Sequence, residues 1–327
     1  MEKLTISDIA RKAGVAKSTV SRYFNGGSVK EETKAIIAKV IEDTGFEPSA
    51  AAQNLKLKST KTIGIVAPSM ISTVTGRQLT AMDETLRKAG YSVIILTTNH
   101  DPDREIEAIE YLRSLRVDGV ILIATTITEA HERLQDSSSV PFLVLGQDFR
   151  HGTSVIYDDY GAGYEVGRYA RKMGHEKVVY LGVNESDEAV GVQRKQGVLD
   201  GLKSERTQIA TVEATWSYEE TRTVARKMLK DYRPTLVIAA TDRMAMAVIQ
   251  EARAQGLSIP DDLSVMGFGG YEYGELMDPQ LATVRFENEE AGIIAARTLI
   301  QMCRREPAAR KQVLGWKFEP GGSVKRK

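Results

Sequence analysis

The chain has 327 residues, is 42% hydrophobic, and carries 44 basic and 44 acidic residues, so its formal net charge is zero. That length suits a small domain joined to a larger body with its own core. Cys303 is the only cysteine, which excludes an intrachain disulfide and a multi-cysteine metal site. No stretch approaches the roughly 20 apolar residues that cross a bilayer, and the polar start MEKLTISDIA predicts no signal segment. We therefore expect a cytoplasmic protein that does not contact a membrane.

The charges are unevenly distributed along the chain. Residues 1–62 hold 11 Lys and Arg against 7 Asp and Glu, whereas residues 63–327 hold 33 against 37. A basic head on a mildly acidic body favours a polyanion bound at one end only.

The first 24 residues predict two short helices joined by a tight turn. Thr5 can cap the first helix, with Asp8 at its N3 position in an acidic variant of the capping box. Gly14 tolerates the left-handed backbone at which this helix stops. A second helix over 16–24 would turn Val20 inward and present small hydroxyls and two cations outward. That outward face comprises Lys17, Ser18, Thr19, Ser21 and Arg22.

A helix with such a face can read base edges in the major groove and contact phosphates, as in a helix-turn-helix. The spacing alone leaves a second interpretation open, because any small three-helix unit has a glycine turn and an apolar stripe. A third helix is predicted over 30–45, and Pro48 ends its packing. Its inward residues are expected to be Ala35, Ile36, Val40 and Ile41.

From residue 62 onward, short apolar runs alternate with amphipathic helical patterns. Helices are predicted over 77–89, 103–115, 160–173 and 242–254. Strands are predicted over 63–67, 91–97, 118–124, 142–146, 177–182, 235–240 and 263–268. This alternation is typical of parallel, doubly wound sheets, and the strands outnumber those of one such sheet. We expect two similar lobes with a ligand cleft beyond the carboxyl ends of their strands.

The run T-x-x-D-I-A-x-x-A-G-V-A-K-S-T-V-S-R over 5–22, Asn25, and G-F-E-P-S-A-A-A-Q-N-L over 45–55 resemble the lac repressor/galactose repressor family of bacterial transcription regulators. The resemblance continues along nearly the whole chain. It implies an all-α helix-turn-helix headpiece and an α/β core of two Rossmann-like lobes, similar to periplasmic sugar-binding proteins. The implied domains are the headpiece 1–47, a hinge helix and linker 48–61, and an effector-binding and dimerisation core 62–327. Lobe 1 would span about 62–158 and 288–316, and lobe 2 about 159–287 and 317–327.

The family likeness also implies how DNA is bound. Lys17, Ser18 and Arg22 are expected to read base edges, and a hinge helix over 50–57 would insert Leu55 into the minor groove. An apolar wedge between base pairs kinks DNA, although Leu55 could instead be an ordinary apolar residue of a short amphipathic helix. Paired hinge helices imply a homodimer on a palindromic operator. The full predicted set of DNA contacts is Thr5, Lys17, Ser18, Thr19, Ser21, Arg22, Asn25, Ser49, Ala52, Leu55 and Lys56.

Two positions depart from the usual headpiece pattern. Ala16 and Lys30 stand where capping serines are frequent, and each would destabilise its helix by about 1 kcal/mol unless compensated.

The likeness further implies an effector site between the lobes. Trp216 could stack on a sugar ring, or be a core tryptophan. Arg194 matches an arginine that bridges ligand oxygens, and could donate a bidentate pair. Asp242 follows a predicted strand, where it could accept two sugar hydroxyls or cap the next helix. The predicted effector contacts are Ser69, Ser72, Thr75, Gln147, Arg194, Trp216, Asp242 and Phe268.

The run VYLGVNESDEAVGVQR, together with SVIYDDYGA, resembles the trehalose-responsive branch of the family. Gln147, however, stands where a phosphate-binding arginine is expected in that branch. A phosphorylated effector would then depend on Arg194 and Arg77. Gly269-Gly270 replaces an acidic residue common in the family, and favours a turn over a phosphate cradle.

Three functions remain in competition on this evidence: a sugar-responsive repressor, a global regulator with a phosphoprotein coeffector, and a solute-binding or sugar-metabolising protein. The headpiece and the polar N-terminus count against the third. No P-loop, G-x-S-x-G or H-E-x-x-H motif is present, and four histidines form no metal-binding pattern, so we expect neither an enzyme nor a cofactor. We expect effector binding to change the angle between the lobes and thereby operator affinity. The effector, the operator and the sign of the response remain open.

Overall fold

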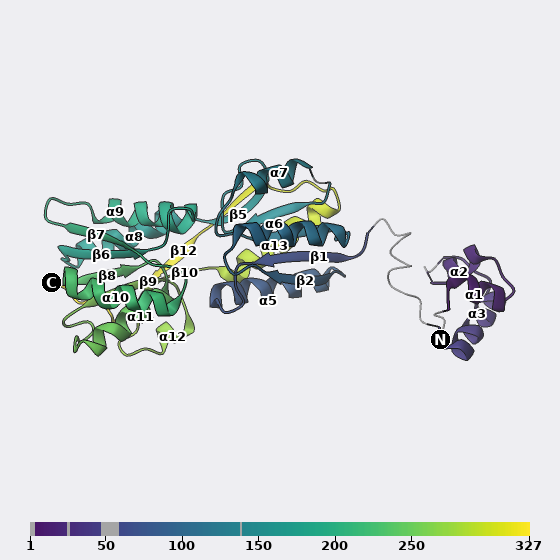
Figure 1. The fold of residues 1–327 in the computed structure, drawn as a ribbon, viewed down its shortest axis with the longest axis horizontal. Coiled ribbons are helices and arrows are strands. Elements are labelled where there is room, and N and C mark those ends of the chain that lie inside the picture. Colours follow the sequence, from purple (N-terminus) through teal and green to yellow (C-terminus); the bar gives the residue numbers. More distant parts are fainter. Residues whose placement is uncertain (1–3, 25–26, 47–58, 138) are drawn as a thin grey trace. The chain divides into compact units, whose positions relative to one another are not determined.

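The computed structural model describes residues 4–24, 27–46, 59–137 and 139–327. The chain divides into two compact units, residues 1–60 and residues 61–327 (Figure 1). Each unit is considered by itself below.

Within its described residues, the first unit contains three helices: α1 (Ile6–Lys12), α2 (Lys17–Phe24) and α3 (Glu31–Thr44). Thr5 caps α1 as predicted. Its Oγ1 accepts a hydrogen bond from the Asp8 N–H at 3.3 Å, and Asp8 Oδ2 accepts from the Thr5 N–H at 3.0 Å. Gly14 follows with a φ of +64°, a left-handed conformation that glycine adopts without a Cβ clash. The tight turn between α1 and α2 is therefore set by local sequence.

The core of this unit corrects the predicted face of α3. Ile37 is completely buried, whereas Ile36 is 49% exposed and Ala35 is also exposed. Val40 and Ile41 are partly buried, as expected. Each helical residue turns the side chain by about 100°, so an error of one residue is enough to exchange an inward for an outward position. Ile37 packs with Ile9, Ala10, Ala13, Val20 and Phe46.

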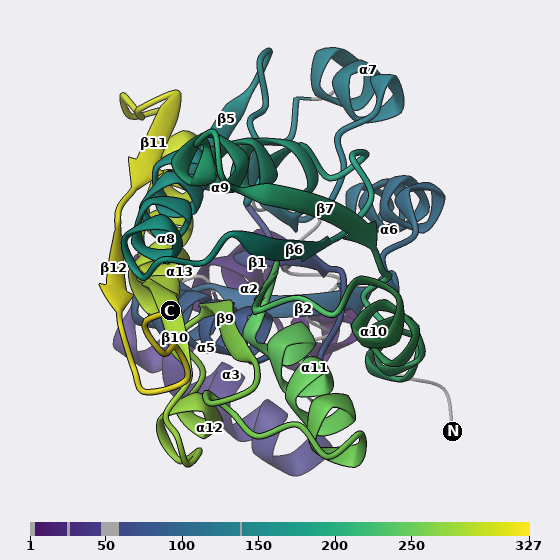
Figure 2. The ribbon, with the colours of Figure 1, turned by 90° about the vertical axis from the view of Figure 1, so that its left-hand side faces the viewer.

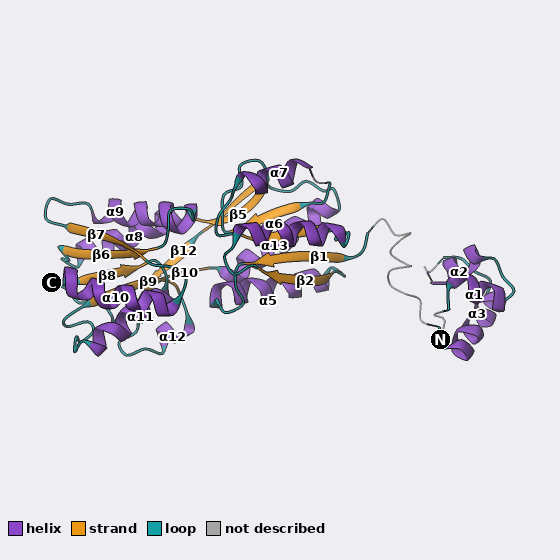
Figure 3. Cartoon of the chain, in the orientation of Figure 1, coloured by secondary structure: helices purple, strands orange, loops and turns teal. Residues whose placement is uncertain are grey.

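The second unit consists of two lobes, each with a six-stranded sheet covered by helices (Figure 3). The sheet of lobe 1 is entirely parallel in the order β11-β5-β4-β3-β1-β2. Its strands are β1 (Thr62–Ala67), β2 (Ser92–Thr97), β3 (Gly119–Ile123), β4 (Phe142–Leu145), β5 (Thr153–Tyr157) and β11 (Lys311–Leu314). Its helices are α5 (Thr73–Lys88), α6 (Pro102–Ser114), α7 (Glu129–Ser137) and α13 (Asn288–Cys303).

Lobe 2 has the order β12-β10-β9-β8-β6-β7, in which only the β10–β12 pair is antiparallel. Figure 2 views this lobe from its end, with α8 and α9 on one side of the strands and α10 and α11 on the other. The strands are β6 (Lys177–Gly182), β7 (Gln208–Glu213), β8 (Leu236–Ala239), β9 (Ser264–Gly269), β10 (Ala282–Phe286) and β12 (Trp316–Glu319). The helical segments are α8 (Asp159–Lys172), the π-helix η1 (Glu188–Arg194), α9 (Lys195–Leu202), α10 (Tyr218–Tyr232), α11 (Asp242–Ala254) and α12 (Glu272–Glu275).

Both faces of the lobe 1 sheet are buried, which is why its strands read as continuous apolar runs. Along β1, Ile63 and Ile65 pack against α5 and α13, whereas Val66 faces a second core beneath α6. The predicted fold class, a helical headpiece with two doubly wound lobes, is confirmed. The seven predicted strands correspond to β1, β2, β3, β4, β6, β8 and β9, and the prediction missed β5, β7, β10, β11 and β12.

The chain passes between the lobes three times within the second unit, at residues 157–159, 286–288 and 314–316. These crossings place the carboxyl ends of the central strands of both sheets toward each other. The space between the lobes is therefore bordered by the loops that follow those strands.

Candidate functional site

One exposed face of α2 carries the residues predicted to read DNA. Lys17, Ser18 and Arg22 are exposed, Thr19 and Ser21 are half-buried, and Val20 faces the core. The Thr5 hydroxyl is engaged by Asp8 Oδ2 at 2.7 Å as part of the cap. Lys30 caps α3 without a side-chain hydrogen bond, as its chemistry predicts. The predicted contacts Asn25, Ser49, Ala52, Leu55 and Lys56, with the hinge helix over 50–57, lie outside the described residues.

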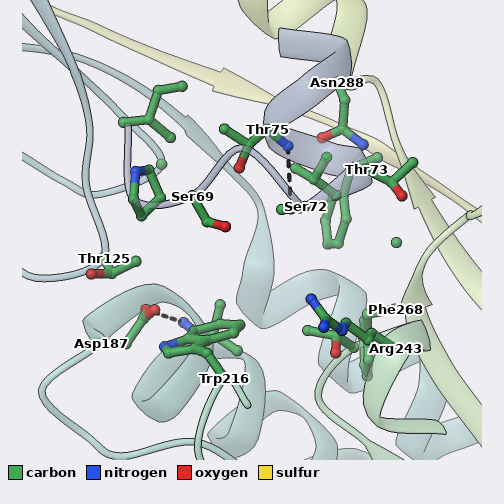
Figure 4. A pocket seen from close by; sticks show the side chains of 18 of the residues that line it. Ser69, Ser72, Thr73, Thr75, Thr125, Asp187, Trp216, Arg243, Phe268 and Asn288 are labelled. Atoms are coloured by element: carbon green, nitrogen blue, oxygen red, sulfur yellow. Dashed lines mark hydrogen bonds between the residues drawn. The ribbon is translucent and has the colours of Figure 1, made fainter. Parts of the chain in front are cut away.

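A cavity of about 450 Å³ lies between the two lobes of the second unit. Figure 4 shows Ser72, Thr75 and Asn288 on one side of it, and Trp216, Arg243 and Phe268 on the opposite side. The first group comes from lobe 1 and the second from lobe 2, so the two lobes form opposing walls. Seven of the eight predicted effector residues line the cavity: Ser69, Ser72, Thr75, Gln147, Arg194, Trp216 and Phe268.

The hydroxyls of lobe 1 are positioned by the start of α5. Ser72 caps this helix, and its Oγ accepts a hydrogen bond from the Thr75 N–H at 3.3 Å. The helix therefore begins at Thr73, four residues before the predicted start, because the cap extends it. Because of this early start, the first turn of α5 borders the cavity and contributes Thr73 and Thr75 to its lining.

Arg194 lies at the end of η1 and is almost fully buried. Its Nε donates to Asp159 Oδ1 at 2.8 Å and its Nη1 donates to the Ala240 carbonyl at 2.6 Å. The guanidinium also lies over the rings of Phe268 and Phe286, at 4.9 and 5.1 Å from their centroids. Burial raises the pKa of Asp159, and the charge of Arg194 opposes that rise. Most of the hydrogen-bonding capacity of Arg194 is therefore used inside the protein.

Asp242 is placed differently from the prediction. It is completely buried and does not border the cavity, and Thr241 rather than Asp242 caps α11. Its carboxylate accepts hydrogen bonds from the Thr283 hydroxyl at 2.5 Å and the Tyr271 N–H at 2.9 Å. A Cβ at Gly267 would lie 2.4 Å from Asp242 Oδ1, so glycine at that position makes room for the carboxylate. Asp242 thus anchors the loop after β9 to β10.

Gln147 joins the two lobes. Its Nε2 donates to Asp187 Oδ1 at 2.8 Å and to the Thr125 carbonyl at 3.1 Å, and its Oε1 accepts from the Ala189 N–H at 3.1 Å. Asp187 also caps η1 through the Val190 N–H at 2.9 Å. Burial raises the pKa of Asp187 to about 6. Asp187 was not among the predicted site residues, although an aspartate just before the helical pattern EAVGVQR is a recognisable cap signal.

Trp216 stacks on His100 of lobe 1, with ring centroids 5.5 Å apart and an interplanar angle of 6°. The backbone of His100 is left-handed, with a φ of +61°, which projects this ring from the end of β2. Burial lowers the pKa of His100, and the charge of Arg243 lowers it further. His100 was not among the predicted site residues, because nothing in the sequence signals a left-handed histidine.

The two arginines considered as phosphate ligands are both engaged. Arg194 pairs with Asp159, and Arg77 lies outside the cavity lining, where its Nη2 contacts Glu272 at 2.9 Å across the lobes. Arg243, which the sequence analysis did not select, borders the cavity with its guanidinium 5.8 Å from the Tyr218 ring centroid. It forms no ion pair with any residue that the structure describes.

In the described parts of the chain, no three His, Cys, Asp or Glu side chains are grouped so that they could hold a metal ion. None of the described helices is long and apolar enough to cross a membrane.

Comparison with known proteins identifies both units. Residues 5–49 match the family model described as bacterial regulatory proteins, lacI family, and residues 60–314 match that of periplasmic binding proteins and sugar binding domain of LacI family. The chain is 32% identical over 302 residues to the sucrose operon repressor of Staphylococcus xylosus, covering 92% of this chain and 94% of the relative. It is 28% identical to the HTH-type transcriptional regulator DegA of Bacillus subtilis, covering 95% of each.

Solved structures share the fold. A lac repressor dimer bound to operator and the anti-inducer ONPF matches with a TM-score of 0.85 and 22% identity, covering 99% of this chain and 100% of that chain. The trehalose repressor from Escherichia coli matches with a TM-score of 0.69 and 22% identity, covering 79% and 99%. These comparisons give the trehalose branch no particular support. The chain belongs to the lacI family of bacterial regulatory proteins, and is a non-enzymatic, DNA-binding transcriptional repressor with an effector-binding core.

Proposed function

We propose that this repressor controls a carbohydrate-utilisation operon, and that a sugar or sugar phosphate bound between the lobes regulates its affinity for a palindromic operator. The observation that carries the proposal is the cavity of about 450 Å³, which has an indole and short hydroxyls on opposing walls. Ligand pockets span roughly 300–1,000 Å³, so this volume suits a sugar of one or two rings. An indole face stacks on the apolar face of a sugar ring, while polar groups fix the hydroxyls.

The names of one relative and of one similar solved structure favour a disaccharide, and the cavity volume is compatible with two rings. The relative from Staphylococcus xylosus is a sucrose operon repressor, and a similar solved structure is a complex of the regulator CelR with cellobiose. We propose sucrose as the first candidate. We further propose that the protein acts as a homodimer, since a palindromic operator presents two equivalent half-sites.

Regulation would operate through the angle between the lobes. The contacts that hold the lobes in the arrangement observed here include Gln147 with Asp187, Arg77 with Glu272, and His100 with Trp216. A ligand that touches both walls prefers one arrangement, and it shifts operator affinity by its differential affinity for the two.

The test is to measure operator affinity while titrating sucrose, trehalose, cellobiose and their 6-phosphates. Binding itself can be followed by tryptophan fluorescence, because only Trp216 of the two tryptophans lines the cavity. Trp316→Phe should keep the response to ligand, and Trp216→Phe should abolish it. If none of these sugars changed fluorescence or operator affinity while a phosphoprotein did, the alternative of a phosphoprotein coeffector would replace this proposal.

A further inference from the structure

Two buried amide side chains border the cavity on the lobe 1 side with incomplete hydrogen bonding. Gln78 of α5 is 2% exposed, and Asn288, the first residue of α13, is 3% exposed. Both are among the residues that line the cavity. Gln78 Oε1 and Asn288 Nδ2 are buried without a hydrogen-bond partner among the described residues.

The hydroxyl of Tyr157, at the end of β5, connects these two amides. Gln78 Nε2 donates to it at 2.9 Å, and it donates in turn to Asn288 Oδ1 at 2.8 Å. Burial raises the pKa of Tyr157, so the phenol keeps the proton that this arrangement uses. The phenol thus pairs with the Gln78 Nε2 donor and the Asn288 Oδ1 acceptor. It leaves Gln78 Oε1, an acceptor, and Asn288 Nδ2, a donor, without partners.

The same result follows if both amides are turned over together. If both were turned over, Asn288 would donate to the phenol and the phenol would donate to Gln78. The pair would again present one vacant acceptor and one vacant donor. The complementary group is therefore one that donates and accepts at the same place.

The packing of α5 on α13 holds the pair in position. A Cβ at Gly292 would lie 2.5 Å from the Gln78 carbonyl oxygen, so glycine permits this close approach of the two helices. Buried polar groups without partners are unfavourable and uncommon in folded proteins. Two of them on side chains that contact the same Tyr157 hydroxyl and line a ligand cavity point to a ligand group that completes them.

We propose that Gln78 and Asn288 form a subsite for one neutral hydroxyl group of the effector, a hydroxyl that donates to one amide and accepts from the other. The inference rests on the proposed function, and specifies the chemistry at this end of the ligand. A phosphate or carboxylate oxygen only accepts, and an ammonium group only donates, so each would leave one amide atom unpaired. Any anionic group of the effector would then lie elsewhere in the cavity.

The test compares Gln78→Met and Asn288→Asp with a matched control, Gln312→Met. Gln312 belongs to the same lobe, donates to Thr298 Oγ1 at 2.8 Å, and is not part of the cavity lining. Affinities for sucrose, trehalose and cellobiose would be measured by calorimetry, together with the melting temperature and operator affinity of each ligand-free variant. The two subsite variants should bind about tenfold more weakly, as expected when a buried polar partner is lost, and the control should stay within about twofold.

Singly deoxygenated analogues of the sugar that binds provide the decisive comparison. One analogue should bind the wild type about tenfold more weakly than the parent sugar, yet bind Gln78→Met as well as the parent does, because the variant no longer recognises that hydroxyl. Unchanged affinity in both subsite variants, or equal losses for every analogue in wild type and Gln78→Met, would overturn the subsite while leaving the proposed function intact. If the wild type bound none of the sugars, the proposed function would fail and the subsite with it.

Discussion

The side-chain amide of Gln147 in lobe 1 lies 2.8 Å from the carboxylate of Asp187 in lobe 2, and both groups are buried. The contact joins the loop after β4 to the cap of η1, the helix that ends at Arg194. The Gln147 side chain of lobe 1 therefore connects directly to η1 of lobe 2, the segment that carries Arg194.

Replacing Gln147 by Leu should destabilise the protein by about 1–3 kcal/mol, because Asp187 would keep its burial and lose a donor. Chemical denaturation of the second unit would measure the loss. Gln301→Leu, at an exposed position of α13 in lobe 1, is the control and should change stability by less than about 0.5 kcal/mol. Equal effects of the two substitutions would contradict the role of Gln147.

The carboxyl of Asp187 should make stability depend on pH. Burial raises its pKa from 3.8 to about 6, so the folded protein binds this proton more tightly than the unfolded chain does. The contribution of this group to stability therefore falls as pH rises from about 4 to about 6, by at most about 3 kcal/mol. Asp187→Asn removes this titrating group. The stability of the variant relative to the wild type should therefore increase as pH rises from about 4 to about 6. Urea unfolding at several pH values would check this, and a constant difference between the two proteins would count against it.

Arg243 should distinguish phosphorylated from unphosphorylated ligands, because it is a cavity-lining cation without an ion pair among the described residues. We expect Arg243→Gln to reduce affinity for sucrose 6-phosphate at least tenfold more than affinity for sucrose, since charge-assisted hydrogen bonds are the stronger ones. Calorimetric titration of both ligands would measure the ratio. A loss of the same size for the two sugars would show that Arg243 contacts hydroxyls only.

Arg22 is exposed on α2, the helix whose outward face carries the predicted base contacts. Arg22→Gln should weaken specific operator binding by roughly 10- to 100-fold, the range for a lost base contact of about 1–3 kcal/mol, and change non-specific binding much less. Arg11→Gln on α1, where Arg11 pairs with Asp8, is a control that also removes one positive charge. Similar losses in both variants would mean that charge alone accounts for the effect. Binding would be measured at one fixed salt concentration.

The elements predicted from the sequence are those whose own residues carry a clear apolar pattern. The helix over 242–254 was predicted with the bounds of α11, and the central strands of both sheets were recognised because they are buried on both faces. Three of the missed strands lie at sheet edges: β7 alternates between exposed and half-buried residues, and β11 and β12 have only four residues each, whereas the missed β5 and β10 are paired on both sides. Such short or half-exposed segments show little apolar pattern in the sequence. They become strands because they form hydrogen bonds with a neighbouring strand.

The same distinction applies to the cavity. Seven residues of its lining were predicted, Arg194 and Trp216 from the family resemblance and others because residues that follow parallel strands gather at one edge of a sheet. The partners of those residues were not predictable, because Gln147 meets Asp187 over 40 residues of sequence and Arg194 meets Asp159 over 35. Asp242 illustrates the limit, since a residue at the end of a strand can turn toward the core as easily as toward a ligand.

The three crossings between the lobes have a mechanical consequence. A protein whose lobes shared one connection could twist, slide or swing, and binding at the cavity would have no single effect elsewhere. Three short crossings at residues 157–159, 286–288 and 314–316 restrict the lobes to rotation about a shared hinge. Any ligand that closes or opens the cavity must therefore move lobe 1 along nearly the same path, whatever its own shape.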